Sequence, residues 1–241
     1  MMISEEPKPN VSLVIPVYND REALEIAVPA ALDALREICD KYEIIIAEDA
    51  STDGSQEYAA HLANENPHIV HMHRNERGGR GSALACAAEQ ALYDIYVYFD
   101  VDLATDIRHL KPIIYKVASE YDIATGSRLL PASDIARSAS REIKSRGYNF
   151  LVRTLLRSKL HDHQCGFKAF NRQKLLTLLP AVQDTHWFWD TEVLVLGQRA
   201  GYKTCEIPVH WIEGFGTTVK QSDVFAMGAS ILKLWWRIHA P

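Results

Sequence analysis

The sequence carries two carboxylates, Asp100 and Asp102, directly after the apolar and β-prone run 95–99. A buried strand that ends there would deliver both side chains to the C-terminal edge of a sheet, where open α/β folds bind their ligands. Two hard oxygen donors suit Mg²⁺ or Mn²⁺, with the diphosphate of a substrate completing the shell. The alternative is a strand that ends in a solvated acidic turn, and an isolated Asp-x-Asp triplet favours that alternative. Other motifs in the chain decide between the two.

The hydrophobic pattern predicts the elements that would position this pair. Short apolar, β-branched runs predict strands, and apolar residues at helical spacing predict helices. The predicted strands cover residues 11–17, 42–48, 69–73, 95–99, 122–125, 164–171 and 203–209. The predicted helices cover residues 20–39, a stretch from the 51–54 turn to about 64, 83–92, 188–200 and part of the interval between 99 and 122. This alternation indicates the α/β class, with a mostly parallel sheet and helices on both faces.

Two amphipathic segments lie outside this alternation. Residues 137–159 hold seven Lys or Arg and one acid, Glu142, among apolar residues. They predict a basic amphipathic helix that meets anionic headgroups, with a solvated helix packed on the sheet as the alternative. Residues 223–239 place Trp235 and Trp236 beside Lys and Arg, which suits a membrane interface or a helix docked on the domain or on a second subunit. We therefore predict an α/β domain over 1–220 and a C-terminal amphipathic helix over 221–241.

Composition excludes several classes of protein. The chain has 241 residues, of which 47% are hydrophobic and 24% charged, as in one globular domain with an appendage. A net charge of −5 and the absence of a basic block argue against nucleic-acid binding. The four cysteines stand far apart, which predicts reduced thiols of a cytosolic protein. We expect no signal peptide and no transmembrane helix, because no apolar run is long enough, so any membrane contact would be peripheral.

The order of several motifs carries a resemblance. Segments 15–20 (IPVYND), 47–54 (AEDASTDG), 75–83 (NERGGRGSA) and 100–102 (DVD) resemble the family 2 glycosyltransferases of GT-A fold. Segments 126–128 (GSR), 141–149 (REIKSRGYN) and 162–170 (DHQCGFKAF) look like the polyprenyl-phosphate branch, which includes the dolichyl-phosphate mannose and glucose synthases. The resemblance runs from about residue 11 to 211. It implies an inverting transfer of a hexose from UDP-glucose or GDP-mannose to a polyprenyl (dolichyl) phosphate, with Mg²⁺ or Mn²⁺ as cofactor.

The first motifs form a candidate nucleotide site. Pro16 and Tyr18, at the end of the first strand, would wall a nucleobase. Asp49 ends the second strand, where a carboxylate can accept the N–H of a uracil or guanine ring. The alternative for Asp49 is a turn or helix N-cap. By resemblance, Asp20 joins the base pocket.

The next motifs would bind the diphosphate. The glycines of 78–81 let the backbone approach the nucleotide, and Arg80 brings a permanent positive charge. Asp100 and Asp102 would hold the metal, which neutralises the charge that grows on the leaving nucleoside diphosphate. The resemblance implies a Gln two residues after the second Asp. Ala104 stands there instead, which leaves a third protein ligand in doubt.

The candidate acceptor site consists of cations. A lipid phosphate is mostly ionised near pH 7, since its second pKa is about 6, so it needs no general base. It needs positive groups that hold it in line with the anomeric carbon. Arg128, Arg141 and Ser145 match the lipid-phosphate positions of the family, and we predict Asp102, Arg128 and Arg141 as the catalytic set. The alternative for the arginines is surface ion pairing.

Four further residues have open roles. Asp190 stands where a hydroxyl-acceptor enzyme of this superfamily would keep its base. It could instead orient the 166–168 loop or start a helix, and the arginine set favours a role other than base. Asp162 and Lys168 are possible donor or acceptor contacts. The family also tends to keep a basic residue after the last strand, where this chain reads GFGTT over 214–218 and Lys220 is the possible substitute.

The leading hypothesis is thus a polyprenyl-phosphate hexose synthase, peripherally bound to the cytoplasmic face of a membrane. Its partners would be the nucleotide sugar, the lipid and the membrane surface, with a homo-oligomer or a separate membrane protein as further possibilities. The second hypothesis is a family 2 enzyme that acts on a sugar hydroxyl, with Asp190 as base. The third is a non-catalytic nucleotide-sugar binding module, which would require a broken metal site.

Overall fold

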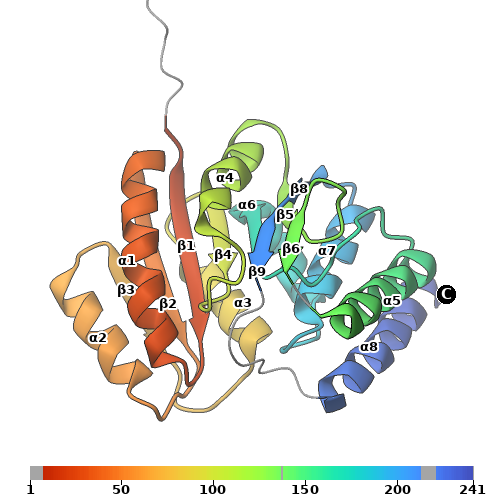
Figure 1. Ribbon diagram of the computed structural model, residues 1–241, viewed down its shortest axis with the longest axis horizontal. Coiled ribbons are helices and arrows are strands. Elements are labelled where there is room, and N and C mark those ends of the chain that lie inside the picture. Colours follow the sequence, from red (N-terminus) through yellow and green to blue (C-terminus); the bar gives the residue numbers. More distant parts are fainter. Residues whose placement is uncertain (1–7, 137, 213–220, 241) are drawn as a thin grey trace, which may run out of the picture.

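The computed structural model describes residues 8–136, 138–212 and 221–240, and the side chains of 221–225 are not described. Its main sheet has seven strands in the order β3-β2-β1-β4-β7-β5-β8 (Figure 1). Strand β7 runs antiparallel to its two neighbours, β4 and β5, and the other pairings are parallel. The strands are β1 (Asn10–Val17), β2 (Lys41–Glu48), β3 (Ile69–His73), β4 (Ile95–Phe99), β5 (Ile123–Ser127), β7 (Phe167–Asn171) and β8 (Thr204–Pro208).

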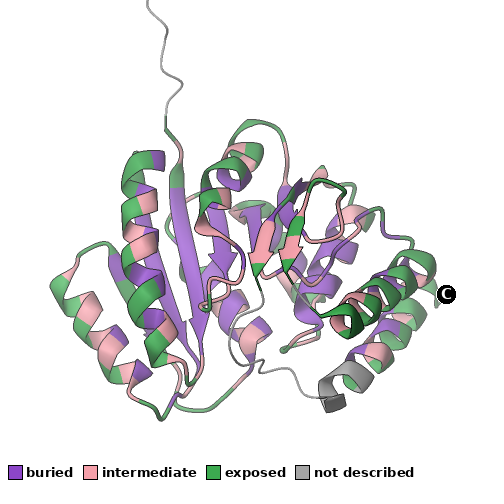
Figure 2. Cartoon of the chain, in the orientation of Figure 1, coloured by how far each residue is buried: buried purple, intermediate pink, exposed green. Residues whose placement is uncertain are grey.

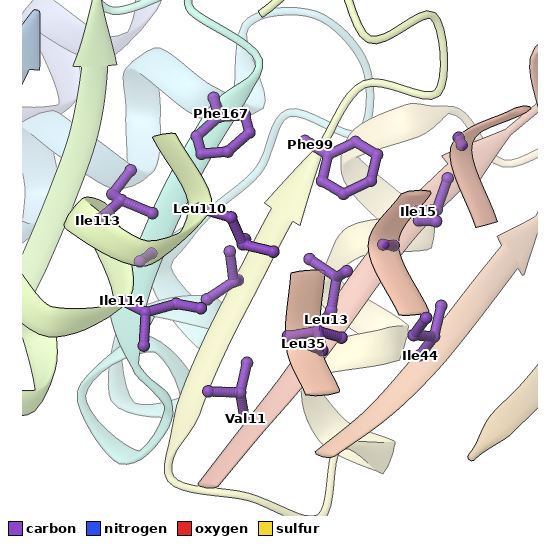
Figure 3. Packing of buried hydrophobic residues seen from close by; sticks show 14 of the residues in the cluster. Val11, Leu13, Ile15, Leu35, Ile44, Phe99, Leu110, Ile113, Ile114 and Phe167 are labelled. Atoms are coloured by element: carbon purple, nitrogen blue, oxygen red, sulfur yellow. The ribbon is translucent and has the colours of Figure 1, made fainter. Parts of the chain in front are cut away.

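Helices cover both faces of this sheet, as the alternation predicts. One core cluster joins the strands to α1 (Arg21–Ile38), α2 (Ser55–Glu65) and α4 (Leu110–Ser119). The other joins them to α3 (Arg80–Gln90), α6 (Arg172–Leu178) and α7 (Trp189–Arg199). Figure 2 shows the strands buried between helices whose outer sides are exposed. Figure 3 shows the first cluster, in which Leu35 and Leu110 reach the strand residues Leu13 and Phe99. The predicted α/β class and the mostly parallel sheet are confirmed.

The chain order creates a switch point between β1 and β4. The chain passes from β1 outward to β2 and β3, and then returns to place β4 on the other side of β1. In such sheets the connections after two neighbouring strands leave in opposite directions, which opens a crevice at their carboxyl ends. Asp100 lies directly after β4, and its backbone N–H donates to the carbonyl of Gly166 before β7 (2.9 Å). The predicted acidic pair therefore stands at the edge where this fold binds ligands.

The two amphipathic segments form helices that pack on each other. Helices α5 (Ala139–Leu156) and α8 (Gln221–His239) lie side by side in Figure 1. Their apolar sides meet α7 in a third cluster, which contains Val152, Leu156, Phe188, Val195, Met227, Ile231 and Leu234. The division of the chain at residue 220 stays a prediction. No helix among the described residues has the length and apolar character needed to span a bilayer.

The structure differs from the predicted elements in a few places. Two short strands, β6 (Asp134–Ala136) and β9 (His210–Ile212), form a separate parallel pair that the pattern does not predict. Helix α3 begins at Arg80, three residues before the predicted start, because Gly79 turns the chain with a φ of 96°. Strand β7 begins at Phe167 and not at 164, since the preceding residues form a loop around Asp162.

Candidate functional site

Arg80 joins the two acidic groups nearest the switch point. Its Nε and Nη2 atoms donate to Oδ1 of Asp100 at 2.8 and 2.6 Å, and its Nη1 donates to Oδ2 of Asp190 at 2.5 Å. Its side chain is only 12% exposed. A guanidinium held in this way by two carboxylates keeps a fixed orientation, which a longer-range ion pair would not give. The structure therefore brings together the predicted residues Arg80, Asp100 and Asp190.

Glycines at two positions make this approach possible. A Cβ atom on Gly81 would lie 2.4 Å from the Cβ of Trp189, so only glycine lets α3 approach the start of α7 this closely. A Cβ on Gly166 would lie 1.7 Å from Oδ2 of Asp100. The 166 position therefore leaves room for the Asp100 carboxylate beside the start of β7.

The Asp100–Asp102 pair fits a hard divalent cation. Burial and the neighbouring Asp100 charge raise the pKa of Asp102 above its ordinary value, as expected for two carboxylates close to one another. Oδ1 of Asp102 accepts from the backbone N–H of Ala104 (3.0 Å), and within the described part of the chain no hydrogen bond reaches Oδ2 of either aspartate. Two carboxylate oxygens are thus available to Mg²⁺ or Mn²⁺. Ala104 contributes no side-chain ligand.

Asp49 organises the loop that precedes Arg80. Its two carboxylate oxygens accept from the backbone N–H groups of Gly78 (2.9 Å) and Gly79 (2.8 Å), and Arg74 lies at 3.6 Å. The N-cap alternative is wrong, because Gly54 holds the N-cap position of α2. The base-binding role stays a prediction.

The other predicted base-pocket residues lie at the end of β1. Pro16 is buried within β1, and Tyr18 follows it half-exposed. The guanidinium of Arg77 lies 3.8 Å from the centre of the Tyr18 ring, a stacked cation–π contact that the sequence pattern does not indicate. Asp20 is half-buried, and burial raises its pKa, opposed by the backbone N–H of Ala23. These residues stay predictions as a nucleobase pocket.

Arg128 is committed to Asp162. Its Nε and Nη2 atoms donate to the two carboxylate oxygens at 2.7 and 2.9 Å, and its backbone N–H donates at 3.0 Å. Burial alone would raise the pKa of Asp162, but the charge and hydrogen bonds of Arg128 hold that pKa well below its ordinary value. Arg128 is thus ion-paired, but the pair is buried and is not the surface pair of the alternative, and the lipid-phosphate role of Arg128 stays a prediction. Asp162 orients Arg128 and is itself fully covered.

Asp190 is surrounded by donors. Lys168 Nζ lies 2.9 Å from Oδ1, the Tyr98 hydroxyl donates to the same oxygen, and Arg80 holds Oδ2. Burial would raise the pKa of Asp190, yet Arg80 and Lys168 lower it below the ordinary value. Lys168 has no exposed side-chain surface and also donates to the carbonyl of Cys165. The contact between Asp190 and Lys168 is the one that the loop-orienting alternative for Asp190 predicts. Tyr98 also belongs to this group of residues around Asp190, and the sequence did not indicate it because it has the pattern of a core strand residue.

Ser145 and Ser127 carry orphan hydroxyls near the predicted acceptor positions. The Oγ atoms of both residues are screened from solvent and have no hydrogen-bond partner within the described residues. Ser145 lies on α5 one turn after Arg141, which is half-exposed, and Ser127 precedes Arg128 at the end of β5. A buried hydroxyl without a partner is costly, which a bound polar ligand would relieve. Ser127 was not among the predicted residues. The 214–218 segment and Lys220 lie outside the described residues.

Comparison with known proteins decides the family. The family model described as glycosyl transferase family 2 matches residues 12–179. The chain belongs to glycosyl transferase family 2. It is 47% identical over 232 residues to glycosyltransferase AglD of Haloferax volcanii, covering 95% of this chain and 37% of that relative. It therefore spans little more than a third of the length of AglD. It is 29% identical over 234 residues to a dolichyl-phosphate β-glucosyltransferase of Trichomonas vaginalis, covering 93% and 72% of the two chains.

Solved structures of low identity show the same fold. The family 2 chain resembles glucosyl-3-phosphoglycerate synthase of Mycobacterium tuberculosis in complex with Mn²⁺, UDP and glucosyl-3-phosphoglycerate, with a TM-score of 0.65, 16% identity and coverage of 95% and 79% of the two chains. It also resembles a mannosyltransferase of Pyrobaculum calidifontis in complex with GDP-Man and Mn²⁺, with a TM-score of 0.64, 19% identity and coverage of 95% and 64%. The GT-A-type architecture that the motif order implies is thereby confirmed.

Proposed function

We propose that this chain is the catalytic domain of an inverting, metal-dependent glycosyltransferase. It would move one hexose from UDP-glucose or GDP-mannose to a polyprenyl phosphate. The observation that carries the proposal is the Asp100–Asp102 pair at the switch point, held in place by Arg80. The names of relatives support the substrate class: one is a dolichyl-phosphate β-glucosyltransferase, and another, from Pectobacterium carotovorum, is an undecaprenyl-phosphate 4-deoxy-4-formamido-L-arabinose transferase.

The donor half of the proposed mechanism rests on fixed charges. Asp100 and Asp102 would hold Mg²⁺ or Mn²⁺, which when bound neutralises charge on the departing nucleoside diphosphate. Arg80 keeps the Asp100 carboxylate oriented through two hydrogen bonds. Asp49 holds the backbone of Gly78 and Gly79, so the loop that leads to Arg80 is preorganised. A site fixed before the substrate arrives loses little energy to reorganisation when the glycosidic bond breaks.

In the second half of the proposed mechanism, the lipid phosphate must be positioned, but it needs no general base. A phosphate oxygen is already a nucleophile near pH 7. Arg128 is directed by Asp162, and Arg141 and Ser145 follow on α5. The orphan Ser145 hydroxyl supports a phosphate oxygen as its partner. Asp190 is a weak candidate for a general base, because three donors occupy its two oxygens and its pKa is lowered.

We further propose that the domain sits on the cytoplasmic leaflet through α5 and α8. Large apolar side chains are exposed on both helices, namely Ile143, Phe150 and Leu151 on α5 and Leu232, Trp235 and Trp236 on α8. Helix α5 adds basic residues, of which Lys144 and Arg146 are exposed. Apolar anchors beside cations suit an anionic bilayer surface. Co-sedimentation with vesicles that contain anionic lipid, weakened in the Phe150→Ser/Trp236→Ser variant, tests this. A concentration-dependent dimer without vesicle binding would contradict it.

The transfer itself is tested with radiolabelled UDP-glucose and GDP-mannose, a short polyprenyl phosphate, and Mg²⁺, Mn²⁺ or EDTA. We expect metal-dependent label in the chloroform phase from one donor, lost in Asp102→Ala and in Arg141→Ala. Arg36→Ala on α1 is the matched control, because its side chain is 61% exposed and pairs with Asp33. Donor hydrolysis without lipid labelling would move the acceptor to water or a sugar hydroxyl, and binding of both donors without turnover would favour a regulatory module.

A further inference from the structure

Two histidines and a glutamate converge on the face of the sheet that α1 and α2 cover. Oε2 of Glu48 lies 2.5 Å from Nδ1 of His73 and 4.0 Å from Nε2 of His71. One ligand atom from each of the three side chains lies within 4.8 Å of the others. The Glu48 side chain has no exposed surface, while those of His71 and His73 are 13% and 29% exposed. The cluster is thus covered on the glutamate side and reachable from solvent on the His73 side.

Strand register explains the convergence. Strand β3 is the edge of the sheet and pairs in parallel with β2, so that Glu48 stands beside His73. Side chains two residues apart on a strand share a face, which places His71 on the same side as His73. The core residues Ile44, Ile46 and Ile69 lie on this face, as alternation along β2 and β3 requires. Strand β1 separates the cluster from β4 and the Asp100–Asp102 pair.

The hydrogen bonds around the cluster leave a nitrogen without a partner. Oε1 of Glu48 accepts from the backbone N–H of Ser51, which fixes the carboxylate and directs Oε2 at the imidazoles. Nε2 of His71 is screened from solvent and has no hydrogen-bond partner in the described part of the chain. It lies 4.0 Å from Oε2 of Glu48, and this distance is too long for a hydrogen bond. An ion between the two atoms would satisfy both.

We propose that Glu48, His71 and His73 form a second metal site, which takes a first-row transition ion such as Zn²⁺. Two imidazoles and one carboxylate suit such ions, whereas Mg²⁺ and Ca²⁺ prefer oxygen donors alone. Tetrahedral Zn²⁺, with bonds of about 2.0–2.1 Å, separates its ligand atoms by about 3.4 Å. The distances of 2.5 and 4.0 Å from Oε2 lie on either side of this value, so small side-chain rotations suffice. Solvent on the exposed side of His73 would complete the shell.

The site is structural and does not depend on the proposed transfer reaction. The bound ion would tie the edge strand β3 to β2 and, through the carboxylate of Glu48, to the turn at Ser51. The Ser51 hydroxyl in turn accepts from the backbone N–H of Asn19 after β1 (3.0 Å). We therefore expect the metal to stabilise β3, β2 and the turn at Ser51 against unfolding.

The test is a titration of the Asp100→Asn/Asp102→Asn variant with Zn²⁺ and Co²⁺, which removes competition from the acidic pair. We expect one equivalent to bind, with the visible absorption of four-coordinate Co²⁺ and a rise in Tm on addition of Zn²⁺. In this background, a further His71→Gln or His73→Gln substitution should weaken metal binding at least about 10-fold, since the loss of even an outer-shell partner lowers metal affinity by that much. If a histidine variant folds poorly, Glu48→Gln tests the same loss of metal binding, because its amide oxygen can still accept from the backbone N–H of Ser51.

His61→Gln is the matched control. His61 lies on α2 with a 61% exposed side chain and pairs with Glu65, outside the cluster. It should leave Co²⁺ and Zn²⁺ binding unchanged. Nitrogen-15 NMR of the Zn²⁺ form should show ligation by Nδ1 of His73 and Nε2 of His71. Absence of stoichiometric binding, binding that survives all three cluster substitutions, or binding that depends on His61 would each overturn the proposal.

Discussion

Gly166→Ala should disable the acidic pair without removing any of its groups. The new Cβ would lie 1.7 Å from Oδ2 and 2.3 Å from Cγ of Asp100, where ordinary contacts require 3.4 Å or more. The carboxylate must therefore move by roughly 1–2 Å, which disturbs the two hydrogen bonds that Arg80 donates to Oδ1. A displacement of about 1 Å at a catalytic group costs on the order of 100-fold in rate. That loss corresponds to about 2.7 kcal/mol of transition-state stabilisation.

The stability cost of this substitution should be small, because the crowded atoms belong to a side-chain end that is 41% exposed. We expect kcat/KM for hexose transfer to fall about 100-fold, with a Mn²⁺ requirement shifted to higher concentration and a Tm within a few degrees of the parent. Transfer kinetics across a Mn²⁺ series, with thermal unfolding alongside, measure both effects.

Two other glycines provide controls. A Cβ on Gly147 of α5 would meet nothing within 4 Å, so Gly147→Ala should leave activity unchanged. A Cβ on Gly126 would lie 2.8 Å from Sγ of Cys165 and 2.9 Å from Val209, away from Asp100. Gly126→Ala should therefore lower Tm by more than Gly166→Ala does, and should lower kcat/KM by less. The reasoning is refuted if Gly166→Ala retains parental kcat/KM and Mn²⁺ dependence.

Further predictions concern the buried charges and the orphan hydroxyl. Asp162→Asn should destabilise the protein by about 3–5 kcal/mol at pH 7, because it leaves Arg128 buried without its counter-charge. Since the folded pKa of Asp162 lies below its ordinary 3.8, its stabilisation is present above pH 4 and is lost as pH falls further, so the gap between parent and variant in urea unfolding should shrink below pH 4. Burial lowers the pKa of His163 from 6.5 to about 3, so the unfolded chain takes up a proton first. Stability should therefore fall between pH 6.5 and 3, by up to about 1.4 kcal/mol per pH unit from this group, and a parent curve no steeper than that of His163→Gln would contradict this. Asp190→Asn should lower Tm and leave the shape of the kcat/KM pH profile intact, whereas loss of the acidic limb from that profile would identify Asp190 as a base. Ser145→Ala should raise KM for the lipid phosphate several-fold with KM for the nucleotide sugar unchanged, and an equal effect on both would argue against an acceptor contact.

The sequence predicted the elements better than the contacts between them. Strands β3 and β4 have the predicted bounds, because short apolar runs between turn residues leave little choice of strand limits. The three-residue strands β6 and β9 were missed, since so short a segment carries no periodicity. The position of the acidic pair followed from one strand and the parallel topology alone.

The partners of the charged residues could not be predicted. Arg80 meets Asp190 across 110 positions of the chain, and Arg128 meets Asp162 across 34. A single sequence gives the types of these residues, but the pairing depends on how α3, α7 and the loop before β7 pack together. The same holds for His71 and Glu48, whose convergence appears only once β3 is placed beside β2.

The most direct test of the central claim is the chemical identity of the lipid product. Mass spectrometry and NMR of the chloroform phase, after incubation with the donor and a short polyprenyl phosphate, should show one hexose joined through the phosphate oxygen, with the anomeric configuration opposite to that of the donor. The Asp102→Ala enzyme should form none of this product. A hexose attached elsewhere, a retained configuration, or an unmodified lipid in the presence of consumed donor would contradict the account.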